Sequence, residues 1–482
     1  MLCPEPMPRA PGRVILGAMF GSRRIAARSA LRRPVCGWLC GCLCGVLACG
    51  GREVVSSDET PPDESELLPD TPLVVSPLGD AFALLIEDAL AQPEEARPYL
   101  RYVLASRGAA ELDSEQERLA LLRLVNSVSL SPQLAAPVQL AELGAYRLDL
   151  RDYLWDRVVD VGGVTFADGW EAIVERSGLA LPALPEEQLA VLTGTATAVL
   201  PARAFLAAAS SGAVYYALTG APGSEIELQE GLAARFPEPG MAPVYNPAFG
   251  VETRHPYQGA RRLVLPDGSA YWQGLPEASR GNSLRQDPFY FNSWETDAIY
   301  PLPNGFPAFF LDAPVYYGTG TPSGPLTERS NRAEDATDAI VADCIACHSS
   351  GPLRVEDFFD DFVRDNGIYA DSDTAERFMN QWPTQEALDA VVAGDSAVYE
   401  GLLERAGLSI ESAGALQAIT RRYAGGLDLA DMAAALHASE TQVRAVLSGS
   451  RIPLGAESFR SRFRALLCQI HPDASAASAY CP

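Results

Sequence analysis

Lysine is absent from this chain of 482 residues, so all 37 of its basic residues are Arg. The 62 Asp and Glu residues outnumber them and give a formal net charge of −25 at pH 7. Such a charge disfavours nucleic acid and anionic lipid surfaces as partners, whereas it would attract a basic protein. The absence of Lys also excludes a docking face rimmed by lysine side chains.

Histidine and the common catalytic signatures are scarce as well. The chain has four His residues, which are His255, His348, His437 and His471. It contains no Walker loop, dinucleotide fingerprint, nucleophile elbow or His-Glu-x-x-His motif. The sequence therefore gives no support to nucleotide-dependent enzymes, serine hydrolases or zinc proteases of those types.

One short motif carries specific chemistry. Residues 344–348 read Cys-Ile-Ala-Cys-His, the pattern to which haem c is attached. The thiolates of Cys344 and Cys347 can each bond one vinyl group of the porphyrin, and His348 can bind the iron as the proximal axial ligand. The sequence therefore predicts one covalently bound haem c.

Zinc and a dithiol redox pair are the alternatives to haem at these cysteines. Zinc needs further ligands, and outside the N-terminal leader only Cys468 and Cys481 are left beside a lipidation candidate. Those two residues are instead candidates for a disulfide that pins the C-terminal tail, which an oxidising compartment permits. The Cys-x-x-Cys spacing alone leaves a dithiol pair open.

The N-terminus predicts export. Residues 1–48 are rich in Arg and lead into a short apolar run, which is the organisation of a signal peptide. Translation from Met19 would give a leader of more usual length. The run ends at Val46-Leu47-Ala48-Cys49-Gly50, which resembles a bacterial lipobox and makes Cys49 the candidate for lipidation. We expect a lipoprotein in the periplasm or at the cell surface, with the outer membrane favoured, and a secreted protein without lipid is the alternative.

The remainder of the chain predicts an α+β fold that is mainly α. Helical N- and C-terminal regions flank a small β-rich segment and a haem c attachment loop. The expected segments are a signal peptide at 1–48, an acidic disordered tether at 49–77, a helical domain at 78–240, a β-rich segment at 241–340, a haem c-binding helical domain at 341–470 and a tail at 471–482.

Local patterns refine this expectation. Apolar spacing predicts a helix over 93–106, and the residues 146–150 are expected to be extended. Pro266-Asp267-Gly268-Ser269 predicts the turn of a hairpin, and Asn304-Gly305 predicts a second turn before another strand. The helices expected at 385–393 and 396–406 are separated by a Gly.

Several segments resemble a known group of proteins. They are Leu124–Ser129, Arg147–Tyr153 with Trp155, Leu200–Phe205, Arg254-His255, Ala270–Trp272, Ile299–Gly305 with its Leu-Pro-Asn-Gly, and Asp343–Gly351. The chain is similar in these to the large single-haem c-type cytochrome-like proteins of planctomycetes and myxobacteria, which are exported or lipid-anchored. The resemblance covers nearly the whole mature chain, and only the haem motif is chemically specific. It implies haem c and export, and it assigns no reaction.

The sixth ligand of the iron has two candidates. His255 lies in an Arg-His-Pro stretch with no helical apolar face, and the resemblance places a His there, so it is the first candidate for the distal axial position. Met379 before Trp382-Pro383 is the alternative, although it also fits helix packing. A surface position before Pro256 is the alternative for His255, and an iron with no sixth protein ligand is a further possibility. Met432 and His437 share an Ala-rich helix and are expected to be core or helix-end residues.

Other residues are expected to support the haem without reacting. Its propionates need cationic or hydrogen-bonding partners, and Arg261, Arg262 and Arg285 are weak candidates because Arg on a strand is often solvated. Asp343 and Pro352 flank the motif and are expected to shape the attachment loop.

Three functions are consistent with these features. The first is electron transfer to a redox partner protein, possibly a basic one, by a six-coordinate haem. The second is a haem enzyme or sensor whose open distal side binds peroxide or a diatomic gas. The third is a structural role for the haem. We expect electron transfer, because the sequence shows no further catalytic constellation and no catalytic residue can be assigned.

Overall fold

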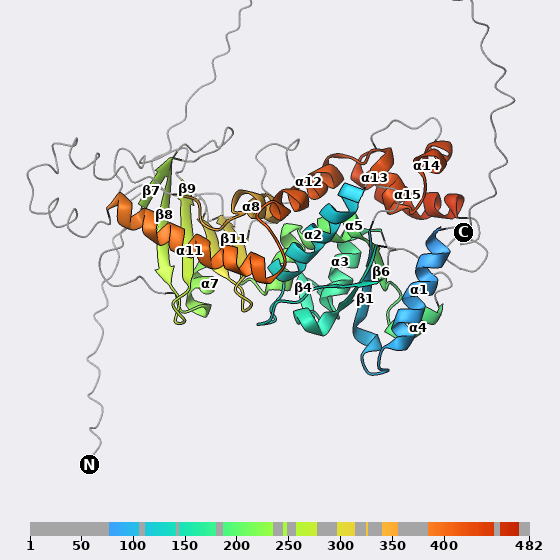
Figure 1. The fold of residues 1–482 in the computed structure, drawn as a ribbon, viewed down its shortest axis with the longest axis horizontal. Coiled ribbons are helices and arrows are strands. Elements are labelled where there is room, and N and C mark those ends of the chain that lie inside the picture. Colours follow the sequence, from blue (N-terminus) through green and yellow to red (C-terminus); the bar gives the residue numbers. More distant parts are fainter. Residues whose placement is uncertain are drawn as a thin grey trace, which may run out of the picture. The chain divides into compact units, whose positions relative to one another are not determined.

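The structure of the protein is a computed structural model (Figure 1). It describes residues 77–105, 111–140, 144–179, 187–234, 244–247, 257–276, 296–313, 324–325, 340–354, 384–447 and 454–471. Residues 71–482 cluster as one compact unit, to which all of these ranges belong. Helices and several small sheets make up this unit, so the α+β prediction is confirmed at that level.

The helices fall into two sets along the chain. Those before the larger sheet are α1 (Pro77–Ala91), η2 (Arg97–Tyr99), α2 (Glu111–Ser127), η4 (Leu150–Tyr153), α3 (Gly169–Ser177), α4 (Glu187–Thr193), α5 (Ala202–Ala209), α6 (Gly212–Thr219) and α7 (Glu225–Gly231). Those after it are α8 (Ile340–Cys347), α11 (Gln385–Arg405), α12 (Ser412–Gly425), α13 (Leu429–Ala435), α14 (Glu440–Val446) and α15 (Ala456–Ile470).

A four-stranded mixed sheet lies within the predicted helical N-terminal domain. Its strand order is β2 (Val138–Leu140), β3 (Ala145–Asp149), β1 (Leu100–Leu104) and β6 (Val199–Pro201). Strand β1 pairs antiparallel with β3 and parallel with β6. A separate two-stranded hairpin consists of β4 (Val159–Val161) and β5 (Val164–Phe166). The extended segment expected at 146–150 is thus confirmed as β3.

The helix predicted over 93–106 is wrong. This segment holds the short turn η2 and then β1, all five side chains of which are buried. A strand that is covered on both faces has no polar alternation, so its apolar run looks like part of a buried helix. The segment is a strand because it pairs with β3 and β6. Both partners lie far along the chain, so the local sequence does not distinguish a strand from a helix here.

The larger sheet is antiparallel and six-stranded. Its order is β12 (Gly324–Pro325), β11 (Pro307–Ala313), β10 (Thr296–Pro301), β9 (Ala270–Pro276), β8 (Tyr257–Val264) and β7 (Val244–Pro247). Both predicted turns are confirmed. The first joins β8 to β9, with Val264 opposite Ala270, and the second joins β10 to β11, with Pro301 opposite Pro307. Gly268 and Gly305 have φ of 88° and 86°, which favours glycine at both turns.

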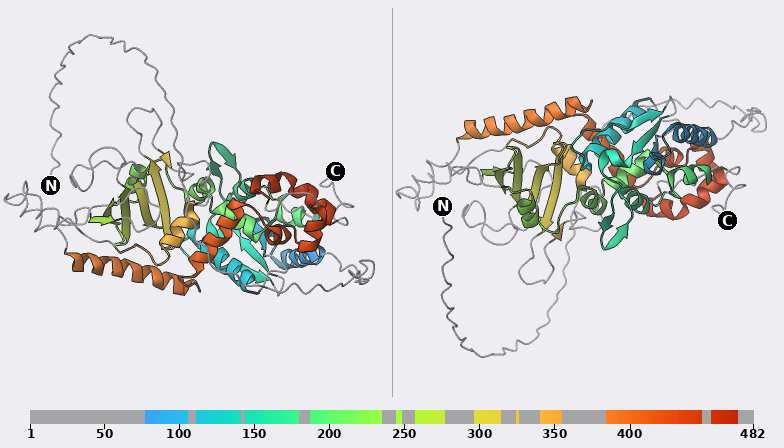
Figure 2. Two further views of the ribbon diagram at one scale, coloured as in Figure 1. Left: turned by 90° about the horizontal axis from the view of Figure 1, so that it is seen from above. Right: turned by 90° about the horizontal axis from the view of Figure 1, so that it is seen from below.

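One face of this sheet packs against α11. Arg262, Trp272, Ile299 and Phe309 lie opposite one another across four strands, and therefore share that face. Arg262 and Trp272 both donate hydrogen bonds to the carboxylate of Asp395 in α11, at 2.8–2.9 Å. Helix α11 consequently runs along the sheet (Figure 2).

The other face belongs to the main hydrophobic core. Tyr271 and Tyr300 stack there with ring centroids 6.4 Å apart, and Phe310 lies 5.4 Å from Tyr216 of α6. The hydroxyl of Tyr271 donates to Glu225 of α7 at 2.6 Å. The sheet therefore has a filled face toward α6 and α7 and a more open face toward α8 and α11.

Two expected helices are one. The sequence predicted a break near Gly394, whereas α11 continues unbroken from Gln385 to Arg405. A Gly inside a helix costs only about 1 kcal/mol relative to Ala. The contacts of Asp395 with the sheet and the burial of Leu388 and Val392 against Trp272 outweigh that cost.

The main core joins segments that are distant in sequence. It contains Val103 of β1, Leu124 of α2, Phe310 of β11, Ile345 of α8 and Leu416 of α12. All three segments predicted for residues 78–470 thus contribute to one core, and the predicted boundaries between them stay predictions. Within the described ranges, no helix is both long enough and apolar enough to cross a membrane.

Candidate functional site

Helix α8 holds both cysteines of the motif. It buries Val341, Ala342 and Ile345 in the main core, and these residues fix the helix against α6 and α12. Cys344 and Cys347 are three positions apart and so lie on one side of the helix, where Cys344 is half-buried and Cys347 is exposed. Neither cysteine forms a disulfide. The expected attachment loop is therefore a helix up to Cys347, because the apolar positions recur at helical spacing.

The chain turns sharply after α8, and His348 lies at the start of this turn. Its backbone N–H donates to the carbonyl of Cys344 at 2.9 Å, and the N–H of Gly351 donates back to the carbonyl of His348 at 3.1 Å. The ring Nδ1 lies 3.1 Å from the carbonyl oxygen of Gly351. Because a carbonyl only accepts, Nδ1 must carry the proton in this contact, and the lone pair of the neutral ring is then on Nε2.

A backbone contact of this kind is what metal-binding histidines commonly make. The nitrogen that does not bind the metal donates to a carbonyl or carboxylate, which fixes the tautomer and the orientation of the ring. The ring of His348 also contacts Phe309 of β11, with centroids 5.8 Å apart. His348 is therefore held from two directions, with Nε2 as the nitrogen suited to bind a metal.

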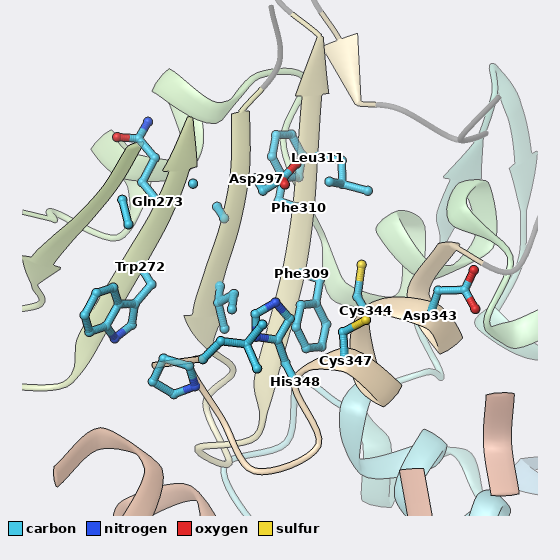
Figure 3. A pocket seen from close by; sticks show the side chains of 16 residues that line it. Trp272, Gln273, Asp297, Phe309, Phe310, Leu311, Asp343, Cys344, Cys347 and His348 are labelled. Atoms are coloured by element: carbon cyan, nitrogen blue, oxygen red, sulfur yellow. The ribbon is translucent and has the colours of Figure 1, made fainter. Parts of the chain in front are cut away.

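The motif opens onto a cavity of about 220 Å³ on the open face of the larger sheet. Its lining includes Cys344, Cys347 and His348 together with Trp272 and Phe309. Figure 3 shows His348 beside Phe309, with Cys347 and Cys344 next to them on α8. The cavity thus combines two thiols and an imidazole with an aromatic wall.

Ala260 and Gly274 leave room for the cavity because they have a very small side chain and none, respectively. Ala260, Gly274, Asp297 and Leu311 lie opposite one another across β8 to β11 and line it. Gly274 is two positions from Trp272 on β9, so this row and Trp272 lie on the same face of the sheet. The row therefore gives a mostly apolar floor with one carboxylate, that of Asp297.

A buried arginine supports the turn from behind. Arg123 of α2 is 0% exposed, and its guanidinium donates to the carbonyl of Ser349 at 3.1 Å. It also donates to the hydroxyl of Ser412 at 2.9 Å and to the hydroxyl of Tyr399, and more weakly to the carbonyl of Ser409 at 3.4 Å. Burial lowers the pKa of Arg123, and it raises the pKa of Tyr399. One side chain thereby joins the motif turn to α11 and α12.

Sequence reasoning missed Arg123, although a signal for it exists. It is the one charged residue between Ala120 and Val125, and its neighbours Leu121, Leu122 and Leu124 are all buried. A charge in an otherwise apolar stretch of helix is unusual unless it has specific partners. The partners lie in segments more than 200 residues away, so the local pattern could not identify them.

The residues that flank the motif have structural contacts. Asp343 accepts hydrogen bonds from Arg421 and Gln417 of α12, both at 2.9 Å, and its carboxylate points away from His348 (Figure 3). Pro352 lines the cavity, and its carbonyl lies 3.5 Å from the hydroxyl of Ser396 in α11. Both residues thus shape the surroundings of the motif, as expected.

The structure gives little support to the arginines that are candidate partners of the haem propionates. Arg262 forms a bidentate ion pair with Asp395, so its charge is already balanced. The side chain of Arg261 and the whole of Arg285 lie outside what the structure describes.

The other predicted site residues are mostly outside the described ranges. His255, Met379, Cys49 and Cys481 all fall there, so the distal ligand and the lipid anchor stay predictions. Cys468 in α15 is disulfide-bonded, and its pairing with Cys481 likewise stays a prediction. Met432 and His437 are buried, in agreement with their expected place in the core.

The alternative of a zinc site finds no ligand set in the described ranges. No group of three or more His, Cys, Asp or Glu residues suited to a metal ion occurs there.

Comparisons of the chain with protein-family models, with curated proteins and with solved structures found no match.

Proposed function

We propose that the protein is a mono-haem c-type cytochrome that transfers electrons. The observation that carries this proposal is the contact of His348 Nδ1 with the carbonyl of Gly351, beside two thiols on the same cavity. A dithiol or an accidental Cys-x-x-Cys would not require an imidazole that is oriented in this way. The fixed ring therefore favours haem over the other uses of the motif.

The residues present suit a haem. Cys344 and Cys347 would hold the porphyrin by thioether bonds, and Nε2 of His348 would bind the iron. Trp272, Phe309 and the apolar floor would contact the ring and exclude water from it. When bound, the haem supplies a one-electron couple, and the protein sets its potential through ligation and burial.

The shape of the site favours electron transfer. Sites that enclose a whole small molecule usually measure about 300–1,000 Å³, whereas the described residues form a cavity of about 220 Å³. A porphyrin held there would be only partly covered by these residues, and Cys347 is itself exposed. The exposed Cys347 would place the attachment point of the porphyrin near the surface, which suits electron exchange with a partner, and the excess of acidic residues favours a basic partner.

The visible spectrum of the reduced protein, with and without carbon monoxide, tests electron transfer against ligand chemistry. If His255 or Met379 completes the coordination, the reduced iron is low-spin and binds carbon monoxide slowly, because a bond must break first. We expect His255→Ala to speed carbon monoxide binding and Met379→Ala to leave it unchanged. A wild-type protein that is high-spin and binds carbon monoxide at once would contradict this and favour an enzyme or sensor for peroxide or a diatomic gas.

We also propose that lipid on Cys49 anchors the exported protein to the outer membrane. Two or more acyl chains on one residue give stable anchoring, which protein contacts at a single position do not replace. Cys49→Ser is expected to move the protein from the membrane fraction to the soluble fraction. Ser57→Ala is the control, since it changes a residue of the predicted tether and leaves the lipobox and every other cysteine intact. Unchanged fractionation of Cys49→Ser would refute the anchor.

A further inference from the structure

Arg123 is a buried cation whose described partners are all neutral. Its hydrogen bonds go to two backbone carbonyls and two hydroxyls, those of Ser349, Ser409, Ser412 and Tyr399. The guanidinium carbon also lies 5.7 Å from the centroid of the Tyr399 ring. No ion pair to a carboxylate balances its charge in the described part of the chain.

Other buried arginines are arranged differently. Arg203 pairs with Glu117 and Asp431, and Arg101 pairs with Asp168 at 3.0 Å. Burying a charge is costly, and ion pairing is the usual way to offset that cost. An uncompensated guanidinium in this core therefore has a positive field that nearby groups feel with little screening by solvent.

The field of Arg123 reaches the motif directly. Its Nη2 donates to the carbonyl of Ser349, the residue next to His348, so the cation lies one residue along the chain from the proposed iron ligand. Oxidation of the iron adds one positive charge, and a nearby cation makes that step less favourable. A buried positive charge in this place should hence favour the reduced haem.

We infer that Arg123 raises the reduction potential of the haem through its uncompensated charge. This inference rests on the proposed function, because it concerns the haem bound at Cys344, Cys347 and His348. It goes beyond that function in assigning the control of the potential to a residue of α2 that does not line the cavity.

A matched pair of substitutions at Ser412 separates charge from structure. The hydroxyl of Ser412 lies 2.9 Å from Nη1 of Arg123, so Ser412→Asp places a carboxylate against the cation. Ser412→Asn has nearly the same shape and no charge. Ser412 is also the first residue of α12, where Asp is well tolerated. Potentiometric titration of both haem-loaded variants is the measurement.

We expect Ser412→Asp to have the lower potential of the two. The predicted change in the one-electron equilibrium is at least tenfold, which corresponds to 59 mV. The potentials are equal only if the haem does not sense a full charge placed at this contact, because both variants keep the contacts of Arg123 with Ser349 and Tyr399. Equal potentials in the two variants would therefore overturn the inference.

A second pair tests Arg123 itself. Arg123→Lys and Arg123→Gln both lose the planar guanidinium, but only Lys keeps the charge. We expect the Gln variant to have the lower potential of the two, with a one-electron equilibrium constant for reduction at least tenfold smaller than that of the Lys variant. Equal potentials in the Lys and Gln variants would again overturn the inference. A wild-type protein without covalent haem would refute the proposed function instead, so the two failures are distinguishable.

Discussion

Gly351 has a backbone conformation that side chains rarely adopt, with φ of 105°. A Cβ at this position would lie 3.3 Å from the Cα of Ser396 in α11. A side chain here would therefore press against the backbone of that helix. The carbonyl of Gly351 is also the acceptor for Nδ1 of His348. The conformation of this glycine therefore helps to orient the imidazole of His348.

We predict that Gly351→Ala destabilises the protein. A residue forced into this region costs about 1–3 kcal/mol, and the contact with Ser396 adds to that. The control is Gly414→Ala in α12, where nothing lies within 4 Å of the new methyl group and helix propensity predicts a gain of up to about 1 kcal/mol. Chemical denaturation of the haem-free variants measures both. Equal stability of the two variants would show that the turn tolerates a side chain.

The sequence identified the candidate residues of the motif but not the residues that support them. Cys344, Cys347 and His348 are recognised because their spacing follows from the porphyrin they would bind. Arg123 and Gly351 act through the carbonyls of a turn, and those contacts exist only when α2, α11 and α12 are in place. Residues that act through tertiary contacts leave little trace in the local pattern.

At the level of elements, turns were easier to predict than buried strands. The hairpin of β8 and β9 was identified because Gly268 favours a positive φ and the flanking residues alternate. Strand β1 was mistaken for helix, since it is covered on both faces and shows no alternation. Helix α6 lies within the predicted helical domain, and its aromatic pair Tyr215 and Tyr216 is buried against the larger sheet.

The position of α8 shows how the elements build the site. Its apolar residues pack on α6 and α12, which directs the opposite side with the cysteines toward the larger sheet. The ion pair of Asp343 with Arg421 adds a second link to α12. This pair is partly exposed, so it is worth no more than about 1 kcal/mol, and the burial of Val341, Ala342 and Ile345 is the larger contribution.

For the molecule as a whole, the motif belongs to a large shared core. The core joins residues from Val103 to Ile419, and the candidate site is assembled from α8, the larger sheet and the turn held by α2. This shared core orients His348 and places the buried cation of Arg123 behind the turn.

Covalent attachment of one haem is the central claim, and the intact mass of the denatured protein tests it most directly. The chain should be produced in a host that attaches haem c. We predict that the wild-type protein keeps the added mass of one haem after denaturation, because thioether bonds survive unfolding. The double variant Cys344→Ala, Cys347→Ala should lack that mass. A wild-type protein without it, or a double variant that keeps it in full, would contradict the account.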